Sequence, residues 1–307
     1  MIKALIFGAN SFSGKHLAAK LADMPEMRVY GADIVPGSGS FDEFAIVDIG
    51  DREQVGKIVN EVQPNWVFNL AGLVNGSAED IYQTNVMGTV YLLEAVQTHV
   101  PKASVLLVGS SAEYGMVASE NLPVTEDLEC KPVGAYGTSK FAATIVGQSY
   151  VRQYNLKIVI ARPFNIIGAG IPERLVLGAI INRAKKVLAM PGEPVVKVGN
   201  LDSQRDFVDI ADVVDSYIAM LKSEQWGEIF NVCSGKPYPV RGVVEMALAR
   251  SPRAIKIEID PALSRPIDLP VLYGSYEKAS KAFGFEPKIS IEESVSAAWN
   301  HAMEKVK

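Results

Sequence analysis

Short apolar runs alternate with longer segments of helical period through the first half of the chain, and this alternation most constrains the fold. A strand-length apolar run followed by a helix-length segment is the pattern of βαβ units, which build a mostly parallel sheet. The run Trp66–Leu70 is apolar over most of its length, which indicates a strand buried on both faces. The sequence therefore predicts an α/β fold with a doubly wound parallel sheet.

The individual elements are read from the same pattern. The candidate strands are Lys3–Phe7, Arg28–Asp33, Phe44–Val47, Trp66–Leu70, Val105–Gly109, Lys157–Arg162 and Ile229–Val232. The candidate helices are Gly14–Ala22, Arg52–Val62, Ala78–Thr98, Tyr136–Tyr154, Ile210–Leu221 and Ile291–Lys305. Frequent prolines and glycines after Arg162 indicate a smaller α/β lobe. We expect residues 1–164 and 205–234 to form one domain and residues 165–204 and 235–307 the other, with the ligand between them.

Composition excludes several classes of protein. The 30 basic and 35 acidic residues give a net charge of −5 without long like-charge runs, so we expect neither a nucleic-acid partner nor a membrane partner. No apolar stretch reaches the roughly 18 to 20 residues of a membrane span. The two cysteines form no CxxC pair and the three histidines form no cluster, which predicts a cytoplasmic protein without a bound metal.

A glycine-bounded loop follows the first predicted strand. Gly8 and Gly14 enclose the segment Ala9-Asn10-Ser11-Phe12-Ser13, which leads into the first helix. Glycines there let the backbone turn tightly, while the free N–H groups of the helix start face a pyrophosphate. The middle glycine of the usual dinucleotide fingerprint is replaced by Ser11, so an ordinary strand-to-helix turn is the alternative.

Later strand ends supply further candidate cofactor contacts. Asp33 ends the second strand, where a carboxylate accepts hydrogen bonds from ribose hydroxyls and repels a 2′-phosphate. This favours NAD(H) and leaves NADP(H) open; a plain acidic turn residue is the alternative. Asp48 and Ile49 follow the third strand and are placed at the adenine, while Ala71 and Gly72 after the fourth strand offer a wall with little side chain.

Tyr136 and Lys140 stand four residues apart on a predicted helix and therefore share one face. A neighbouring ammonium favours the phenolate, so this pair predicts a usable proton donor. Ser110, directly after the fifth strand, is placed to hydrogen-bond the oxygen that Tyr136 protonates. The alternatives are a partly exposed helix face for the pair and a capping serine for Ser110.

Together these motifs resemble those of an extended short-chain dehydrogenase/reductase of the NAD-dependent epimerase/dehydratase family, which has a Rossmann-type fold. The segments that carry the resemblance are the Gly8–Gly14 loop, Asn85–Thr89, Ser110-Ser111, Tyr136 with Lys140, Arg162–Asn165 and Arg205–Asp209. Val196–Leu201, Phe230–Gly235 and Arg265-Pro266 before Gly274-Ser275 are similar to the subgroup of GDP-4-keto-6-deoxy-D-mannose reductases.

The resemblance implies roles for further residues. Asn85 and Pro163 join the cofactor site, and Lys140 holds the nicotinamide ribose. The implied contacts to a nucleotide-diphosphate sugar, with GDP-sugar favoured, are Ser111, Asn165, Val198, Arg205 and Arg265. Surface or domain-bridging ion pairs are the alternative for the arginines, and an edge strand and turn for Val195–Leu201. A homodimer is also implied.

Two departures from the family pattern bear on the activity. Dehydratases of this kind carry an acid where this chain has Ala112, although Glu113 follows directly. Some reductases of this kind lack an acid at the position of Asp33 and accept NADPH. We expect a reductase that acts on the C4 ketone of a GDP-4-keto-6-deoxyhexose. The alternatives are a nucleotide-sugar 4-epimerase, a disfavoured 4,6-dehydratase, and a non-catalytic dinucleotide-sensing protein.

Overall fold

A seven-stranded parallel sheet forms the larger part of the computed structural model, which describes residues 1–263 and 269–304. Its strands in chain order are β1 (Ile2–Phe7), β2 (Met27–Asp33), β3 (Glu43–Ile46), β4 (Trp66–Asn69), β5 (Ser104–Val108), β6 (Lys157–Pro163) and β11 (Ile229–Val232). Their spatial order, β11-β6-β5-β4-β1-β2-β3, reverses direction between β1 and β4. A crevice for a ligand forms at such a switch point. The predicted Rossmann-type α/β fold is confirmed.

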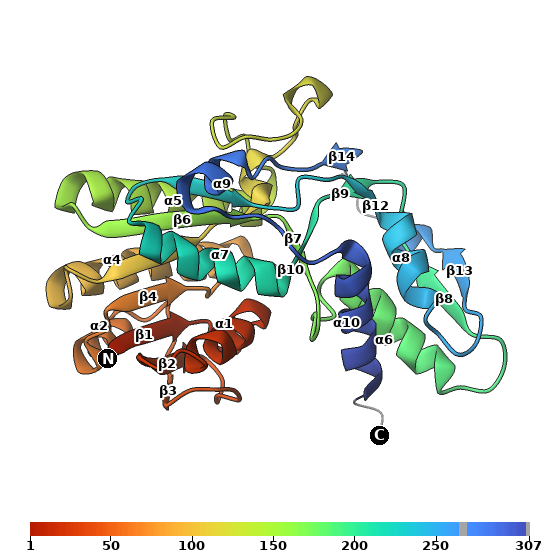
Figure 1. Cartoon of the computed structure of the whole chain (residues 1–307), viewed down its shortest axis with the longest axis horizontal. Helices are drawn as coiled ribbons and strands as arrows, with labels where there is room; N and C mark the ends of the chain where they lie inside the picture. The colour runs from red at the N-terminus through yellow and green to blue at the C-terminus, as the bar shows by residue number, and fades with distance from the viewer. Residues whose placement is uncertain (264–268, 305–307) are drawn as a thin grey trace.

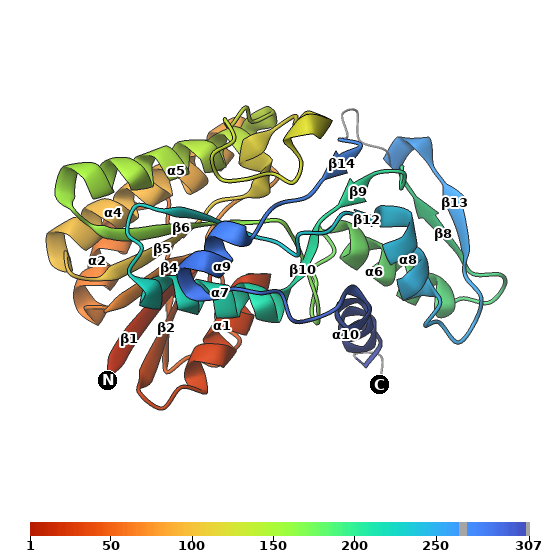
Figure 2. The same ribbon diagram turned by 45° about the horizontal axis from the view of Figure 1, so that its top comes forward.

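Helices cover both faces of this sheet (Figures 1 and 2). One face carries α2 (Arg52–Val62), α4 (Gly88–His99) and α5 (Gly134–Tyr154), and the other carries α1 (Phe12–Ala22), α7 (Ile210–Ser223) and α9 (Glu277–Phe283). Alternate residues of β1 supply both cores, because side chains along a strand point to opposite faces. Ala4 and Ile6 pack in the core under α1 and α7, whereas Leu5 and Phe7 pack in the core under α2 and α4.

The helix predicted over Ala78–Thr98 is not continuous. The structure divides it into α3 (Ala78–Tyr82), a π-helical turn η1 (Gln83–Met87) and α4. Asn85 lies in the π-helical turn, and Thr89 Oγ1 donates a hydrogen bond to its backbone carbonyl at 2.8 Å. Local π-helical turns inside helices are frequent at functional sites. The turn places the Asn85 side chain in the interior at the carboxyl edge of the sheet.

The smaller lobe lies beyond the carboxyl ends of the sheet strands (Figure 1). Its helices are α6 (Val176–Leu188), α8 (Val240–Leu248) and α10 (Ile291–Glu304), and its strands are β8 (Val195–Val198), β9 (Gln204–Arg205), β12 (Tyr238–Pro239), β13 (Lys256–Ile259) and β14 (Val271–Leu272). Ile180, Val196, Val244 and Trp299 pack in its own hydrophobic core. The parallel pair β7 (Asn165–Ile167) and β10 (Phe207–Asp209) connects the two parts.

Three short 3₁₀ helices complete the described structure, η2 (Ser111–Tyr114), η3 (Ser119–Asn121) and η4 (Pro261–Leu263). The predicted division into two domains stays a prediction, although α9, assigned to the smaller lobe, carries Ala279 into the core of the large sheet. Within residues 1–263 and 269–304, no helix has both the length and the apolar character required to cross a membrane.

Candidate active site

The loop from Gly8 to Gly14 is built for close backbone approach. Gly8 has a φ of +73°, and a Cβ added there would lie 2.6 Å from Ala71 N; a Cβ on Gly14 would lie 2.4 Å from Gly8 O. Ser11 caps α1, because its Oγ accepts a hydrogen bond from Gly14 N at 3.0 Å. The serine that replaces the middle glycine therefore stabilises the helix start, whose remaining N–H groups suit an anion.

A cavity of about 760 Å³ opens at the carboxyl edge of the sheet, above β1, β2, β3 and β4. We call it the sheet-edge cavity. The residues of the predicted cofactor site that line it are Gly8, Asn10, Ser11, Asp33, Asp48, Ile49, Ala71 and Gly72. It lies at the topological switch point, where doubly wound sheets bind their ligands.

Asp33 and Asn10 are joined within this cavity wall. Asp33 Oδ2 accepts a hydrogen bond from the backbone N–H of Asn10 at 2.9 Å. The Asn10 side chain in turn holds the following loop, because its Nδ2 donates to Val35 O at 2.9 Å and its Oδ1 accepts from Ser38 N at 3.1 Å. Among the described residues, nothing hydrogen-bonds the other oxygen of Asp33, Oδ1, which is therefore available to a ribose hydroxyl.

Lys140 is buried beneath Gly72, with only 7% of its surface exposed. Its Nζ donates to Val108 O at 2.9 Å, and a Cβ on Gly72 would lie 3.1 Å from that Nζ. Burial disfavours the charged form and lowers the pKa of Lys140 to about 8. Asn85 is fixed beside it, because its Nδ2 donates to Ser139 Oγ at 2.8 Å.

Ser110 and Tyr136 meet at the carboxyl end of β5. Burial raises the pKa of the Tyr136 phenol above its usual range, while a side-chain hydrogen bond with Ser110 and the charge of Arg174 act in the opposite direction. The sequence predicted that Lys140 lowers this pKa, and that prediction is wrong. Desolvation outweighs the favourable interactions here, and the Lys140 ammonium donates to a backbone carbonyl instead.

The Glu113 carboxylate lies behind this site, in the interior. Its side chain is fully buried and accepts hydrogen bonds from Arg162 Nε at 2.8 Å and from Thr144 Oγ1 at 3.0 Å. It therefore cannot replace the acid that the dehydratase pattern places at Ala112. The sequence had left Glu113 open as a substitute for that acid. Its burial against Arg162 therefore disfavours a dehydratase further.

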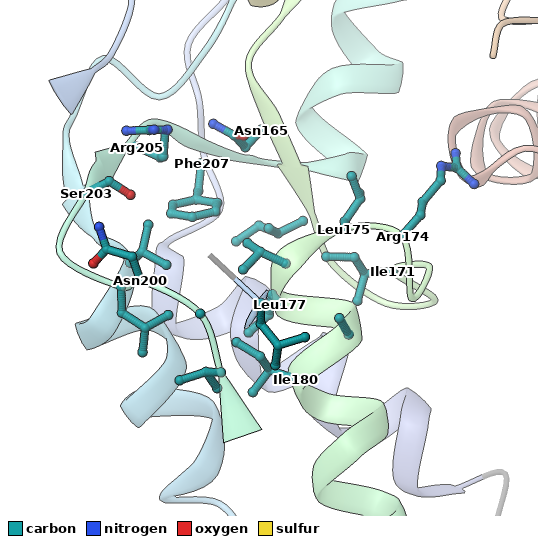
Figure 3. A pocket seen from close by; sticks show the side chains of 18 of the residues that line it. Asn165, Ile171, Arg174, Leu175, Leu177, Ile180, Asn200, Ser203, Arg205 and Phe207 are labelled. Carbon is teal, nitrogen blue, oxygen red and sulfur yellow. The ribbon is translucent and has the colours of Figure 1, made fainter. Parts of the chain in front are cut away.

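A second cavity of about 260 Å³, which we call the lobe cavity, lies between α6 and the segment that follows β8 (Figure 3). Of the predicted substrate contacts, Asn165, Val198 and Arg205 line it. Arg205 is fixed at its edge, because its Nη1 donates to Leu269 O at 2.7 Å. Arg265 lies outside the described residues.

Other predicted residues stand apart from both cavities. Phe12 begins α1 and packs edge-to-face on His16, with ring centroids 5.3 Å apart, and Pro163 is buried at the end of β6. Gly14 and Ser111 serve the turns that begin α1 and η2. Sequence reasoning missed Arg174, which lines both cavities. A lone arginine in the proline- and glycine-rich segment after β7 was the available signal.

Comparison with known proteins assigns the chain to a family. A family model described as GDP-mannose 4,6 dehydratase matches residues 5–298. The chain belongs to this family. The match to the GDP-mannose 4,6-dehydratase family covers both the sheet and the smaller lobe.

The proteins to which this chain is similar include a reductase and a dehydrogenase. The chain is 28% identical to a GDP-6-deoxy-D-mannose reductase from Pseudomonas aeruginosa, over 96% of this chain and 95% of that protein. It is 26% identical to a GDP-6-deoxy-D-talose 4-dehydrogenase from Aggregatibacter actinomycetemcomitans, over 92% of each. The solved structure of RMD from Pseudomonas aeruginosa complexed with NADPH has a TM-score of 0.86 and 27% identity, covering 99% of this chain and 100% of that chain.

Proposed function

We propose that this protein reduces the C4 ketone of a GDP-4-keto-6-deoxyhexose with a reduced nicotinamide dinucleotide, NADH being favoured. The observation that carries the proposal is the meeting of Ser110 and Tyr136 one helical turn from buried Lys140, at the edge of a sheet whose neighbouring cavity suits a dinucleotide. The reductase and dehydrogenase relatives, both acting on GDP-6-deoxyhexoses by their names, support the substrate class.

The residues present fit a dinucleotide. The positions of Gly8 and Gly14 leave no room for a Cβ, so the backbone itself forms the cradle at the start of α1. The sheet-edge cavity, about 760 Å³, falls within the usual size of a cofactor site. Asp33 at its far wall favours unmodified ribose hydroxyls, and the adjoining loop, residues 34–40, carries no lysine or arginine to meet a 2′-phosphate.

Three side chains divide the chemistry. When bound, the reduced nicotinamide supplies hydride to C4 of the sugar. Tyr136 donates its phenolic proton to the C4 oxygen, and its raised pKa keeps that proton in place at neutral pH. Ser110 hydrogen-bonds the same oxygen and stabilises the negative charge that develops there. Lys140 holds the ribose hydroxyls next to Gly72.

The nucleotide of the sugar occupies the lobe cavity in this proposal. Arg205 binds the diphosphate, because a guanidinium pairs with phosphate oxygens and stays charged at any working pH. Asn165 contacts the sugar nucleotide at the cavity edge. Val198, at the end of β8, packs against the nucleobase. Ser111 lies next to Ser110 at the start of η2, where we place it against the sugar.

The test is incubation of the purified protein with GDP-4-keto-6-deoxymannose and either NADH or NADPH. We expect loss of nicotinamide absorbance in a one-to-one ratio with the 6-deoxyhexose formed, whose identity chromatography then establishes. A 4-epimerase interconverts sugar nucleotides without net loss of that absorbance. A dinucleotide-sensing protein binds NADH and turns over none of the sugar nucleotides offered.

We also propose that the protein is a cytoplasmic homodimer. Ile145 and Tyr154 are exposed on α5, which supports a dimer formed through the outer helices of the sheet. Light scattering in solution tests the oligomeric state. Cys130 and Cys233 are free thiols, which suits the reducing cytoplasm.

A further inference from the structure

Arg174 stands where the two cavities meet. It lies between β7 and α6, in the smaller lobe, and is the one described residue that lines both the sheet-edge cavity and the lobe cavity. Figure 3 shows its side chain extending away from the apolar side chains of the lobe cavity, toward the helix drawn in faint red, which is α1. The guanidinium is therefore directed at the sheet-edge cavity, although its backbone belongs to the other lobe.

The charges around the sheet-edge cavity are unbalanced. Among the described residues that line it, Asp33, Asp48 and Asp80 are acidic and Arg174 alone is basic. A dinucleotide brings two further negative charges on its pyrophosphate into this acidic surrounding. Lys140 lies beneath Gly72 at one wall of the cavity, and the start of α1 supplies only partial positive charge. A guanidinium that faces the cavity adds a full positive charge that offsets the repulsion.

The Arg174 side chain is available for this contact. It is exposed, and it forms no hydrogen bond or ion pair with any residue of 1–263 or 269–304. Its positive charge acts to lower the pKa of the Tyr136 phenol, against the effect of burial. The lobe cavity has two other arginines in its lining, Arg183 and Arg205, which could meet a diphosphate bound there.

We propose that Arg174 binds the pyrophosphate of the dinucleotide, which then lies between the amino end of α1 and a guanidinium carried by the smaller lobe. This inference rests on the proposed function, because it requires a dinucleotide in the sheet-edge cavity. In this arrangement a residue of the smaller lobe contacts a cofactor that is bound at the sheet. Because Arg174 also lines the lobe cavity, a bound cofactor fixes part of the wall of that cavity. We therefore expect bound ADP-ribose to increase the affinity for GDP.

Calorimetric titrations with ADP-ribose and with GDP test the assignment without any turnover. ADP-ribose carries the pyrophosphate of the cofactor, and GDP carries the diphosphate of the sugar nucleotide. For Arg174→Gln we expect ADP-ribose to bind about tenfold more weakly, as for loss of one charged hydrogen bond, with GDP alone changed less than twofold. For Arg174→Lys, which keeps the charge without the planar fork, we expect an intermediate loss.

Arg183→Gln is the matched control, because Arg183 lines the lobe cavity alone. It should leave ADP-ribose binding unchanged. Wild-type affinity of Arg174→Gln for ADP-ribose, or a greater loss for GDP than for ADP-ribose, overturns the inference while leaving the proposed function intact. Failure of the wild-type protein to bind ADP-ribose and NADH overturns both. Thermal unfolding without ligands checks that each variant is folded.

Discussion

Arg162 and Glu113 form an ion pair in the interior, with Nε 2.8 Å from Oε2 and side chains that are 2% and 0% exposed. The second oxygen of Glu113, Oε1, accepts the backbone N–H of Ser110 at 2.8 Å. The pair therefore fixes the position of the serine that meets Tyr136. The Arg162 guanidinium also lies 5.0 Å from the ring centroid of Tyr114, which ties the turn after β5 to β6.

Breaking this pair should destabilise the protein strongly. Glu113→Gln removes the negative charge and leaves the buried Arg162 without its counter-charge, which typically costs about 3–5 kcal/mol of unfolding free energy. Chemical denaturation measures the change. The double variant Glu113→Leu with Arg162→Met removes both charges and should cost less than the two single changes added together. A Glu113→Gln protein within about 1 kcal/mol of wild type would contradict the buried pair.

Replacing Tyr136 by Phe should remove the proton donor and keep the aromatic ring. We expect kcat for the 4-keto sugar nucleotide to fall about 10²- to 10⁴-fold, the usual contribution of a positioned acid. NADH binding, followed by fluorescence titration, should change only a few-fold. Tyr154→Phe, an exposed change on the same helix, is the control. Wild-type turnover by Tyr136→Phe would contradict the proposed role.

Lys140 should make stability depend on pH above neutrality. Its pKa is about 8 in the folded protein, below the usual 10.5, so folding opposes its charged form. This cost, about 3 kcal/mol below pH 8, diminishes as the pH rises from 8 to 10.5. Between pH 8 and 10.5, the unfolding free energy of wild type should therefore rise relative to that of Lys140→Met, by up to about 3 kcal/mol. Denaturant unfolding at several pH values measures it, and the exposed change Lys102→Met should show no such shift.

A difference between Lys140→Met and wild type that stayed constant from pH 8 to 10.5 would contradict the buried ammonium. Activity gives an independent readout on the same variant. Because Lys140 is placed at the cofactor ribose, we expect Lys140→Met to bind NADH more weakly and to lose turnover.

Removing the charge of Asp33 should relax the choice of cofactor. Asp33→Asn keeps an oxygen to accept the Asn10 N–H but no longer repels a 2′-phosphate. We expect the ratio of kcat/KM for NADPH to that for NADH to rise about tenfold, as steady-state kinetics with both cofactors would measure. Asp42→Asn is the control, because Asp42 Oδ2 accepts Val29 N–H outside the sheet-edge cavity. An unchanged ratio for Asp33→Asn would place the cofactor preference elsewhere.

Most of the seven-stranded sheet was predictable because its signals are local. The strands of the sheet agree with their apolar runs to within a residue or two at each end, and α2 begins and ends where the helical period does. The Gly8–Gly14 turn and the spacing of Tyr136 and Lys140 are likewise properties of a few consecutive residues. The continuous helix expected through Asn85 failed, since nothing in the local period distinguishes a π-helical turn from an α-helix.

By itself, therefore, the sequence determined the order of the elements, the backbone turn at the first strand and the shared face of Tyr136 and Lys140. Only the tertiary structure decided that Glu113 turns inward to Arg162, that burial raises the pKa of Tyr136, and that Arg174 faces both cavities. The physical reason is range: turn chemistry and periodicity act over a few residues, whereas desolvation and pairing depend on segments that packing brings together from distant parts of the chain.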